Sequence, residues 1–179
     1  MDIQIRAAVS ADHSKILGLF TQTFTASDGA SEGALLEQLV TDLLQSLDVS
    51  SVSCFVAMSG TQLVGSVFTT ALTFDQDVKV QMLAPVAVDT GFQGRGFGQQ
   101  MINQVISVLT HRNVDTLVTY GDPAYYSKVG FGAISEEYIP APMPLSMPIG
   151  WLGQTLNRPI SVPLTNPRCV KAFSDPSYW

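Results

Sequence analysis

The chain has 179 residues, a length that fits one domain and would cramp two. Hydrophobic residues make up 46% of it and charged residues 13%, the opposite of the balance found in disordered chains. Fifteen acidic and nine basic residues give a net charge of −6, which disfavours binding to the DNA or RNA backbone. These values predict a globular protein with no nucleic-acid partner.

Cys54 and Cys169 are the only cysteines, and neither lies in a CxxC pair or beside a histidine at ligand spacing. The sequence therefore carries no zinc signature, and we expect no metal site. Two reduced thiols are favoured over one disulfide. The chain does not open on a basic segment followed by an apolar stretch, and no apolar run reaches the ~20 residues of a membrane span. We expect a cytoplasmic protein with no membrane partner.

Apolar spacing in the first half predicts a strand, two amphipathic helices and a hairpin of two strands. These elements are expected at residues 3–5, 10–24, 35–47, 52–58 and 62–74. Ser10 is a suitable N-cap for the first helix. Residues 25–33 are small and polar, which predicts a loop between the two helices.

The second half predicts a third strand, a helix, a short strand, a short helix and a final strand after Phe131. The first four are expected at residues 78–88, 101–109, 115–120 and 123–129. Pro85 has no amide hydrogen to donate, so the third strand should be interrupted or bulged there.

The end of the chain differs in composition, because eight of the ten prolines fall at or after Pro140. Proline prevents long helices and central strands, so residues 140–179 are expected to be extended and irregular. Spaced apolar residues favour a tail that wraps onto the domain over a disordered one. These anchors are Trp151, Leu152, Ile160 and Phe173.

A cluster of glycines follows the third predicted strand and is the most informative segment. An apolar strand ends at Val88, four glycines follow between residues 91 and 98, and a helix begins directly behind them. A helix start carries unpaired backbone amides and a partial positive charge, and glycine lets the backbone approach a ligand closely. Such a segment is typical of an anion site, most often for phosphate.

The spacing alone leaves two alternatives open. A Walker A loop is excluded, because Gln99 follows Gly98 where that motif needs lysine. The dinucleotide fingerprint GxGxxG fits Gly94 and Gly96 but has Gln99 at its third glycine, and Asp122 comes late for its acidic residue. A Rossmann-type site is thus one alternative, and a tight strand–helix connection that binds nothing is the other.

Gln93-Gly94-Arg95-Gly96-Phe97-Gly98 also resembles the Gln/Arg-x-x-Gly-x-Gly/Ala loop of the GNAT superfamily of acyl-CoA-dependent N-acetyltransferases. Upstream, Pro85-Val86-Ala87-Val88-Asp89 is similar to the family's fourth strand. Downstream, Gly121-Asp122-Pro123-Ala124-Tyr125-Tyr126 precedes Gly130-Phe131 and resembles the family's later motif, in which a tyrosine stands four residues before Gly-Phe. The double tyrosine after Gly-Asp-Pro is similar to small bacterial members with poorly defined substrates.

The resemblance implies an α/β (α+β) fold with a mixed, mostly antiparallel central sheet flanked by helices. It covers about residues 1–135, which we take as a GNAT-like acetyltransferase domain. Residues 136–179 would be a Pro-rich C-terminal extension packed on the same domain. Homodimers are common among such domains, so a homodimer is a candidate assembly.

The resemblance also implies an N-acetyltransferase that moves an acetyl group from acetyl-CoA to a primary amine of a small molecule or peptide. The loop amides would hold the pyrophosphate, and unpaired backbone groups of the preceding strand would hold the pantetheine and polarise the thioester carbonyl. Tyr126 would be the general acid that protonates the departing thiolate, and ring packing is the other role open to it. The expected acetyl-CoA-binding residues are Val86, Ala87, Val88, Gln93, Gly94, Arg95, Gly96, Phe97, Gly98 and Gln99.

No pattern identifies the general base, for which Asp89, Asp122, Glu32 and Glu37 are candidates. The acceptor pocket would be formed by the loop at residues 25–33, the helix behind it, the turn at residues 74–78 and the tail. Two other functions stay open: a non-catalytic acyl-CoA-binding or regulatory module of the same fold, and a nucleotide-binding α/β protein of another class.

Overall fold

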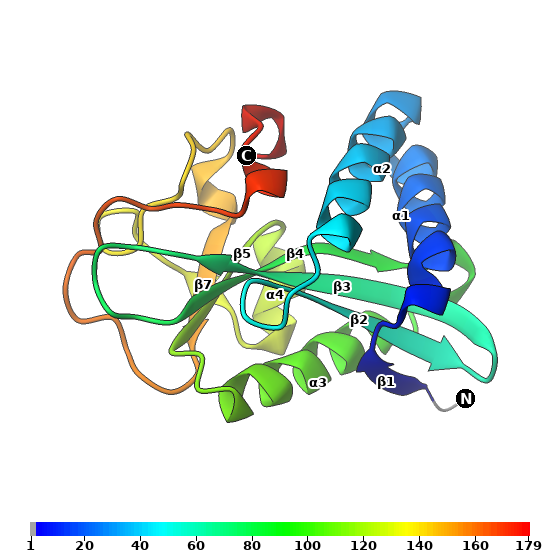
Figure 1. The fold of residues 1–179 in the computed structure, drawn as a ribbon, viewed down its shortest axis with the longest axis horizontal. Helices are drawn as coiled ribbons and strands as arrows, with labels where there is room; N and C mark the ends of the chain where they lie inside the picture. Colours follow the sequence, from blue (N-terminus) through cyan, green and yellow to red (C-terminus); the bar gives the residue numbers. More distant parts are fainter. Residues whose placement is uncertain (1–2) are drawn as a thin grey trace. The chain divides into compact units, whose positions relative to one another are not determined.

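The computed structural model describes residues 3–179, so Met1 and Asp2, where the predicted domain starts, lie outside the described residues. Seven strands are hydrogen-bonded in the order β1-β2-β3-β4-β5-β7-β6, and helices flank this mixed, open sheet (Figure 1). The strands are β1 (Gln4–Ala7), β2 (Val52–Ser59), β3 (Gln62–Leu72), β4 (Val80–Val88), β5 (Thr116–Tyr120), β6 (Gly132–Ala133) and β7 (Trp151–Thr155). The helices are α1 (His13–Asp28), α2 (Ala30–Gln45), α3 (Phe97–His111) and α4 (Pro123–Tyr126). The fold class implied by the family resemblance is confirmed.

The chain forms two compact units. The first contains the residues up to Phe68 together with Pro85–Gln104, and the second contains Thr69–Ala84 together with Val105–Trp179. β3, β4 and α3 therefore each contribute one part to each unit. The boundary at residue 135 expected from the sequence, between the family-like part and the extension, stays a prediction.

In the first unit, helices cover both faces of the strands. Phe20 of α1 packs on Phe68 of β3 with ring centroids 5.8 Å apart. A Cβ on Gly65 of the same strand would instead lie 3.3 Å from the Met101 sulfur of α3. Because positions three apart in a strand point to opposite faces, α1 and the start of α3 lie on opposite sides of β3.

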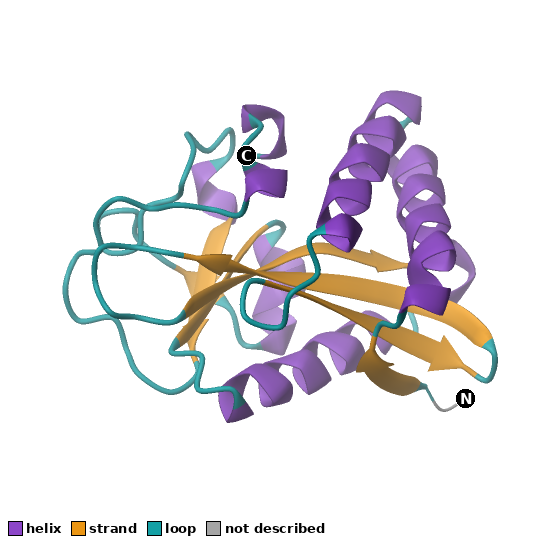
Figure 2. Ribbon diagram, viewed as in Figure 1, coloured by secondary structure: helices purple, strands orange, loops and turns teal. Residues whose placement is uncertain are grey.

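The loop predicted at residues 25–33 is wrong. α1 continues to Asp28 and α2 begins at Ala30, so the two helices lie side by side with only Gly29, at a φ of +96°, between them (Figure 2). The residues are small because the helices approach closely there, and a Cβ on Gly33 would overlap the Thr25 side chain. Ser10 is also not the cap of α1, since it opens a 3-10 turn, Ser10–Asp12, that precedes the helix.

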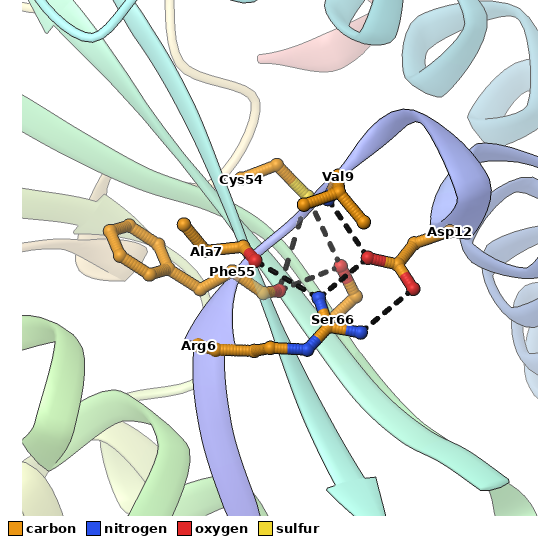
Figure 3. Close-up of polar contacts among 7 residues, drawn as sticks. All are labelled: Arg6, Ala7, Val9, Asp12, Cys54, Phe55 and Ser66. Atoms are coloured by element: carbon orange, nitrogen blue, oxygen red, sulfur yellow. Dashed lines mark hydrogen bonds and ion pairs between the residues drawn. The ribbon is translucent and has the colours of Figure 1, made fainter. Parts of the chain in front are cut away.

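An ion pair ties β1 to the start of α1 (Figure 3). The Arg6 guanidinium donates to both oxygens of the buried Asp12 carboxylate, at 2.7 and 3.0 Å, and the Val9 amide donates to it at 2.9 Å. The hydrogen bonds from Arg6 outweigh the effect of burial and lower the pKa of Asp12 to about 2.

Both cysteines are free thiols. Cys54 is buried on β2, with its sulfur 3.4 Å from the Ser66 hydroxyl oxygen (Figure 3). Burial raises the pKa of Cys54 to about 12, so this thiol stays protonated and unreactive at neutral pH.

In the second unit, β5 is bonded on both sides. Its parallel ladder with β4 runs from Val80–Thr116 to Met82–Val118, and its antiparallel ladder with β7 runs from Thr116–Thr155 to Tyr120–Trp151. The expectation that residues 140–179 hold no central strand is therefore wrong. β7 contains no proline, and its buried Trp151 and Leu152 let it pair between β5 and β6 despite the prolines around it. β6 is correspondingly not the final strand.

The remaining tail residues also make specific contacts within the second unit. Arg158 donates to the buried Asp115 carboxylate at 2.9 Å and to the Asp77 carbonyl at 2.7 Å. Trp179 donates its indole hydrogen to the Phe173 carbonyl at 2.9 Å. Of the four expected anchors, Trp151, Leu152 and Phe173 are buried and Ile160 is partly exposed.

Candidate functional site

The glycine segment after β4 is an exposed turn that leads directly into α3. Gly94 and Gly96 have φ values of +72° and +80°, in the left-handed region that favours glycine. A Cβ at either position would meet no atom within 4 Å, so open space lies beside the turn. The Gly96 carbonyl accepts the Gln100 amide hydrogen at 3.0 Å, which places Gly96 at the cap of α3. The first amides of α3 lack carbonyl partners within the helix, so this turn suits a pyrophosphate.

Side chains hold the turn from both ends. Phe97 is buried at the start of α3, and its ring lies 6.1 Å from that of Phe92. The Arg95 guanidinium lies 5.4 Å from the centroid of the Phe92 ring, a cation–π contact that keeps its charge at the turn. The Gln93 side-chain amide donates to the Val88 carbonyl at 2.9 Å. One of the carbonyls expected to be free for pantetheine therefore has a donor within the protein.

β4 continues across Pro85 without interruption. Buried and partly exposed residues alternate along β4, except that Met82 and Leu83 are both buried. Such a break in the alternation is typical of a β-bulge. The ladder with β5 ends at the pair Met82–Val118, and the next carbonyl, that of Leu83, accepts the Thr119 hydroxyl hydrogen at 2.7 Å. A side chain thus replaces a backbone donor where the ladder stops.

Tyr126 lies at the end of α4 in the second unit, and the motif around it explains its position. The Asp122 carboxylate accepts the Ala124 amide hydrogen at 2.9 Å, and Pro123 takes the first helical position. Gly121 makes room for the phenol, because a Cβ there would lie 2.6 Å from the Tyr126 ring. The Phe131 ring packs edge-on against Tyr126 at 5.6 Å.

Burial raises the pKa of Tyr126 to about 12, and the Thr119 side chain opposes that rise. The phenol therefore keeps its proton at neutral pH, as a general acid must. The Tyr125 ring stands at 90° to that of Tyr126 with the centroids 5.1 Å apart.

The candidate bases are placed as follows. Asp89 and Asp122 each cap a short turn by accepting a backbone amide hydrogen at 2.9 Å. Glu32 and Glu37 lie on α2, where Glu37 is exposed. The structure adds no feature that singles out one of the four.

A pocket of about 380 Å³ opens beside Asp89 in the first unit, between α1 and the turn that joins β2 to β3. Lys15 and Asp89 give its lining one charge of each sign. Its volume is in the range of small-molecule sites. The acceptor pocket expected around residues 25–33 stays a prediction.

Neither a metal centre nor a membrane helix is found among residues 3–179. No three His, Cys, Asp or Glu side chains in this range gather closely enough to bind a metal ion. No helix in this range has the length and apolar character needed to cross a bilayer.

Residues 4–134 match the family described as acetyltransferase (GNAT) domain. The chain therefore belongs to the GNAT family of acetyltransferases, as its motifs indicated. It is 28% identical over 133 residues to the uncharacterized N-acetyltransferase YhbS of Escherichia coli K12, which covers 71% of this chain and 72% of that protein.

Two solved structures share the fold over nearly the whole chain. The crystal structure of Escherichia coli YhbS in complex with CoA has a TM-score of 0.78 at 22% identity and covers 97% of this chain and 92% of that one. A GNAT acetyltransferase of Brucella melitensis in complex with acetyl-CoA has a TM-score of 0.75 at 18% identity, covering 97% and 99%.

Proposed function

We propose that this protein transfers an acetyl group from acetyl-CoA to a primary amine of a small molecule or peptide, by direct attack in a ternary complex. The observation that carries the proposal is the turn at Gly94 and Gly96, which presents the start of α3 to open space. Two relatives with this fold were crystallised with CoA and with acetyl-CoA, which supports an acyl-CoA as the ligand of this turn.

In this proposal the chain holds acetyl-CoA through two segments. The amides of the turn and of the first residues of α3 bind the pyrophosphate, and backbone groups near the end of β4 bind the pantetheine. Arg95 adds a positive charge at the turn. The residues assigned to binding are Val86, Ala87, Val88, Gln93, Gly94, Arg95, Gly96, Phe97, Gly98 and Gln99.

The thioester supplies an activated acetyl group when acetyl-CoA is bound. A new C–N bond to the amine forms as the C–S bond breaks, and the amine gives up one proton. We assign to Tyr126 the delivery of a proton to the departing sulfur, since its phenol is protonated at neutral pH. The proton on Tyr126 is then restored from solvent.

Turnover against a panel of primary amines, measured as release of free thiol from acetyl-CoA, tests the function directly. We expect thiol release that depends on an amine, and calorimetry should show binding of acetyl-CoA but not of NAD. Binding of acetyl-CoA without turnover of any amine would favour the non-catalytic acyl-CoA-binding module. The homodimer stays a prediction, which sedimentation equilibrium checks.

A further inference from the structure

The pocket of about 380 Å³ beside Asp89 uses none of the residues assigned to acetyl-CoA. It lies wholly within the first unit, where the first half of α1, the turn between β2 and β3, and Asp89 line it. Buried Leu19 and Leu63 give it a small apolar part, whereas most of its lining carries hydroxyl, amide or charged groups. Such a lining suits a small polar ligand with a short aliphatic part.

Gly18 opens the helical wall of this pocket. It lies in the middle of α1, where glycine destabilises a helix relative to alanine. Outside the backbone of the helix itself, the heavy atom nearest to a Cβ at this position would be the Gln22 side-chain nitrogen, at 4.0 Å. Packing therefore does not require glycine here, in contrast to Gly33 of α2, where a Cβ would overlap Thr25. The missing side chain instead leaves the pocket open to a ligand.

Lys15 and Asp89 bring one charge of each sign to the pocket from different elements. Neither belongs to the three ion pairs found among residues 3–179. Lys15 favours the charged form of Asp12, but both oxygens of that carboxylate already accept from Arg6. A ligand with a single charge would leave one of the two pocket charges unmatched, whereas a zwitterion would match both.

Asp89 also holds the turn that leads to α3. Its Oδ1 accepts the Gly91 amide hydrogen at 2.9 Å, and its carbonyl accepts that of Phe92 at 2.8 Å. Its own amide donates to the Val64 carbonyl of β3 at 2.9 Å. The carboxylate has a second oxygen that this cap does not use. An ammonium group bound to that oxygen would fix the carboxylate and, with it, the turn.

We propose that this pocket is a regulatory site for a small zwitterion, an α-amino acid or a dipeptide. Its carboxylate lies at Lys15, its ammonium at Asp89 and its aliphatic side chain on Leu19 and Leu63. Binding fixes Asp89 and the turn, and so strengthens the binding of acetyl-CoA. The ligand is not the acceptor amine, because the pyrophosphate held at this turn and the thioester lie at opposite ends of the pantetheine arm. The site stands without the proposed function, and its effect on acetyl-CoA rests on that function.

The ligand is tested first, on the full chain without acetyl-CoA. The probe is the dipeptide alanyl-leucine, titrated by NMR detected on the peptide. N-Acetyl-alanyl-leucine lacks the ammonium, and alanyl-leucinamide lacks the carboxylate. We expect saturable binding of alanyl-leucine and at least about tenfold weaker binding of each blocked peptide, since each loses one charged contact. Equal affinity for the three peptides, or no binding of alanyl-leucine, would overturn the proposal.

Variants of the protein then locate the peptide. Gly18→Leu places a side chain in the pocket and should abolish binding, and leucine favours the helix, so the variant should fold. Lys15→Met and Asp89→Asn each remove one charge and should weaken binding of alanyl-leucine about tenfold. The controls are Gly18→Ala, which adds only a Cβ, and two variants that remove an exposed charge of the second unit, Lys171→Met and Asp175→Asn. Asp175 is matched to Asp89, since its carboxylate also caps a short turn. Undiminished binding in Gly18→Leu would show that the peptide lies elsewhere.

Combining peptides with variants identifies the partner of each charge. Lys15→Met should bind alanyl-leucine and alanyl-leucinamide alike, because the partner of the carboxylate is gone. Asp89→Asn should likewise bind alanyl-leucine and its N-acetyl form alike. A preference for the zwitterion that is unchanged in both variants would refute the assigned orientation.

The regulatory role is read from the binding of acetyl-CoA. With saturating alanyl-leucine, calorimetry should give an affinity for acetyl-CoA about fivefold higher, at the low end of typical couplings. Gly18→Leu should show no such increase. An unchanged affinity in the wild type would overturn the regulatory role. Thiol release that depends on alanyl-leucine and is lost in Gly18→Leu would make this pocket the acceptor site instead. If acetyl-CoA does not bind at all, the regulatory role fails with the proposed function, whereas the peptide titrations alone decide whether the site exists.

Discussion

Among single residues, Tyr126 carries the most specific expectation. Its phenol is protonated at neutral pH and packed edge-on against the Phe131 ring. Tyr126→Phe keeps the ring and should lower kcat by about 100-fold, near the lower end of general acid catalysis, because a thiolate leaves fairly well unaided. Affinity for acetyl-CoA, measured by calorimetry, should change little.

The neighbouring phenol provides the control for this substitution. Tyr125→Phe removes a hydroxyl of the same helix that has no assigned role, so its kcat should stay near that of the wild type. A wild-type kcat for Tyr126→Phe at saturating acetyl-CoA, held across several pH values, would show that the ring only packs.

Asp12 is the residue whose charge should matter most for acid stability. The pKa of Asp12 is about 2 in the folded chain, whereas an ordinary aspartate, as in the unfolded chain, has a pKa of 3.8. At pH values between the two, the unfolded state therefore binds more protons than the folded state. Its contribution is therefore present above about pH 5 and is lost as the pH falls toward 2. Asp12→Asn should lower the free energy of unfolding by about 1–3 kcal/mol at pH 7, because Arg6 loses its charged partner.

Urea unfolding at a series of pH values checks this expectation. The difference in stability between the wild type and Asp12→Asn should shrink between about pH 5 and pH 2. The other carboxylates titrate in both proteins and cancel in the comparison. A difference that stays constant over this range would mean that the ion pair with Arg6 does not carry the effect.

At the scale of elements, the turn between β4 and α3 combines a left-handed backbone at Gly94 and Gly96 with open space beside it. Gly96→Val would place a β-branched residue at a φ of +80° and fill the space where the pyrophosphate is proposed to lie. Affinity for acetyl-CoA should fall at least tenfold, since the valine side chain would occupy the proposed pyrophosphate position, while the left-handed φ costs about 1–3 kcal/mol of stability. Calorimetry on a variant shown to be folded by circular dichroism is the measurement.

Gly29 supplies the control for Gly96→Val. It too has a left-handed φ and open space, but it lies between α1 and α2. Gly29→Val should cost similar stability and leave the affinity for acetyl-CoA unchanged. Equal losses of affinity in the two variants would point to general strain rather than to a pyrophosphate site.

These elements also show what the sequence alone could predict. Apolar periodicity located most helices and strands, and the glycine pattern indicated the turn before α3, because both signals are local. The small residues at 25–33 predict a loop, but the structure has helix there on both sides of Gly29. Gly33 is small because α2 packs against Thr25 of α1, and such a contact between helices leaves no local signal in the sequence. The close approach of the Tyr126 ring to Gly121 depends on how α4 folds back on the end of β5, and no local pattern records it.

At the scale of the whole molecule, β7 makes the C-terminal extension part of the sheet. Five residues of β5, from Thr116 to Tyr120, pair with β7, and β6 pairs with its other edge. A chain shortened to residues 1–135 would leave β5 with an unpaired edge and remove Trp151 from the core of the second unit. We expect this fragment to show no cooperative unfolding by calorimetry.

A single substitution tests whether that loss comes from the strand or from the ion pair that follows it. Arg158→Gln removes the cation beside the buried Asp115 carboxylate and leaves β7 intact. The Asp115 carboxylate still accepts a hydrogen bond from the Lys79 amide. It should cost about 1–2 kcal/mol while unfolding stays cooperative. Cooperative unfolding of the 1–135 fragment, with wild-type affinity for acetyl-CoA, would instead make residues 136–179 a dispensable addition to an independent domain. Because an internal strand supports its neighbours on both sides through backbone hydrogen bonds, we expect its removal to be far more damaging than the loss of one surface cation.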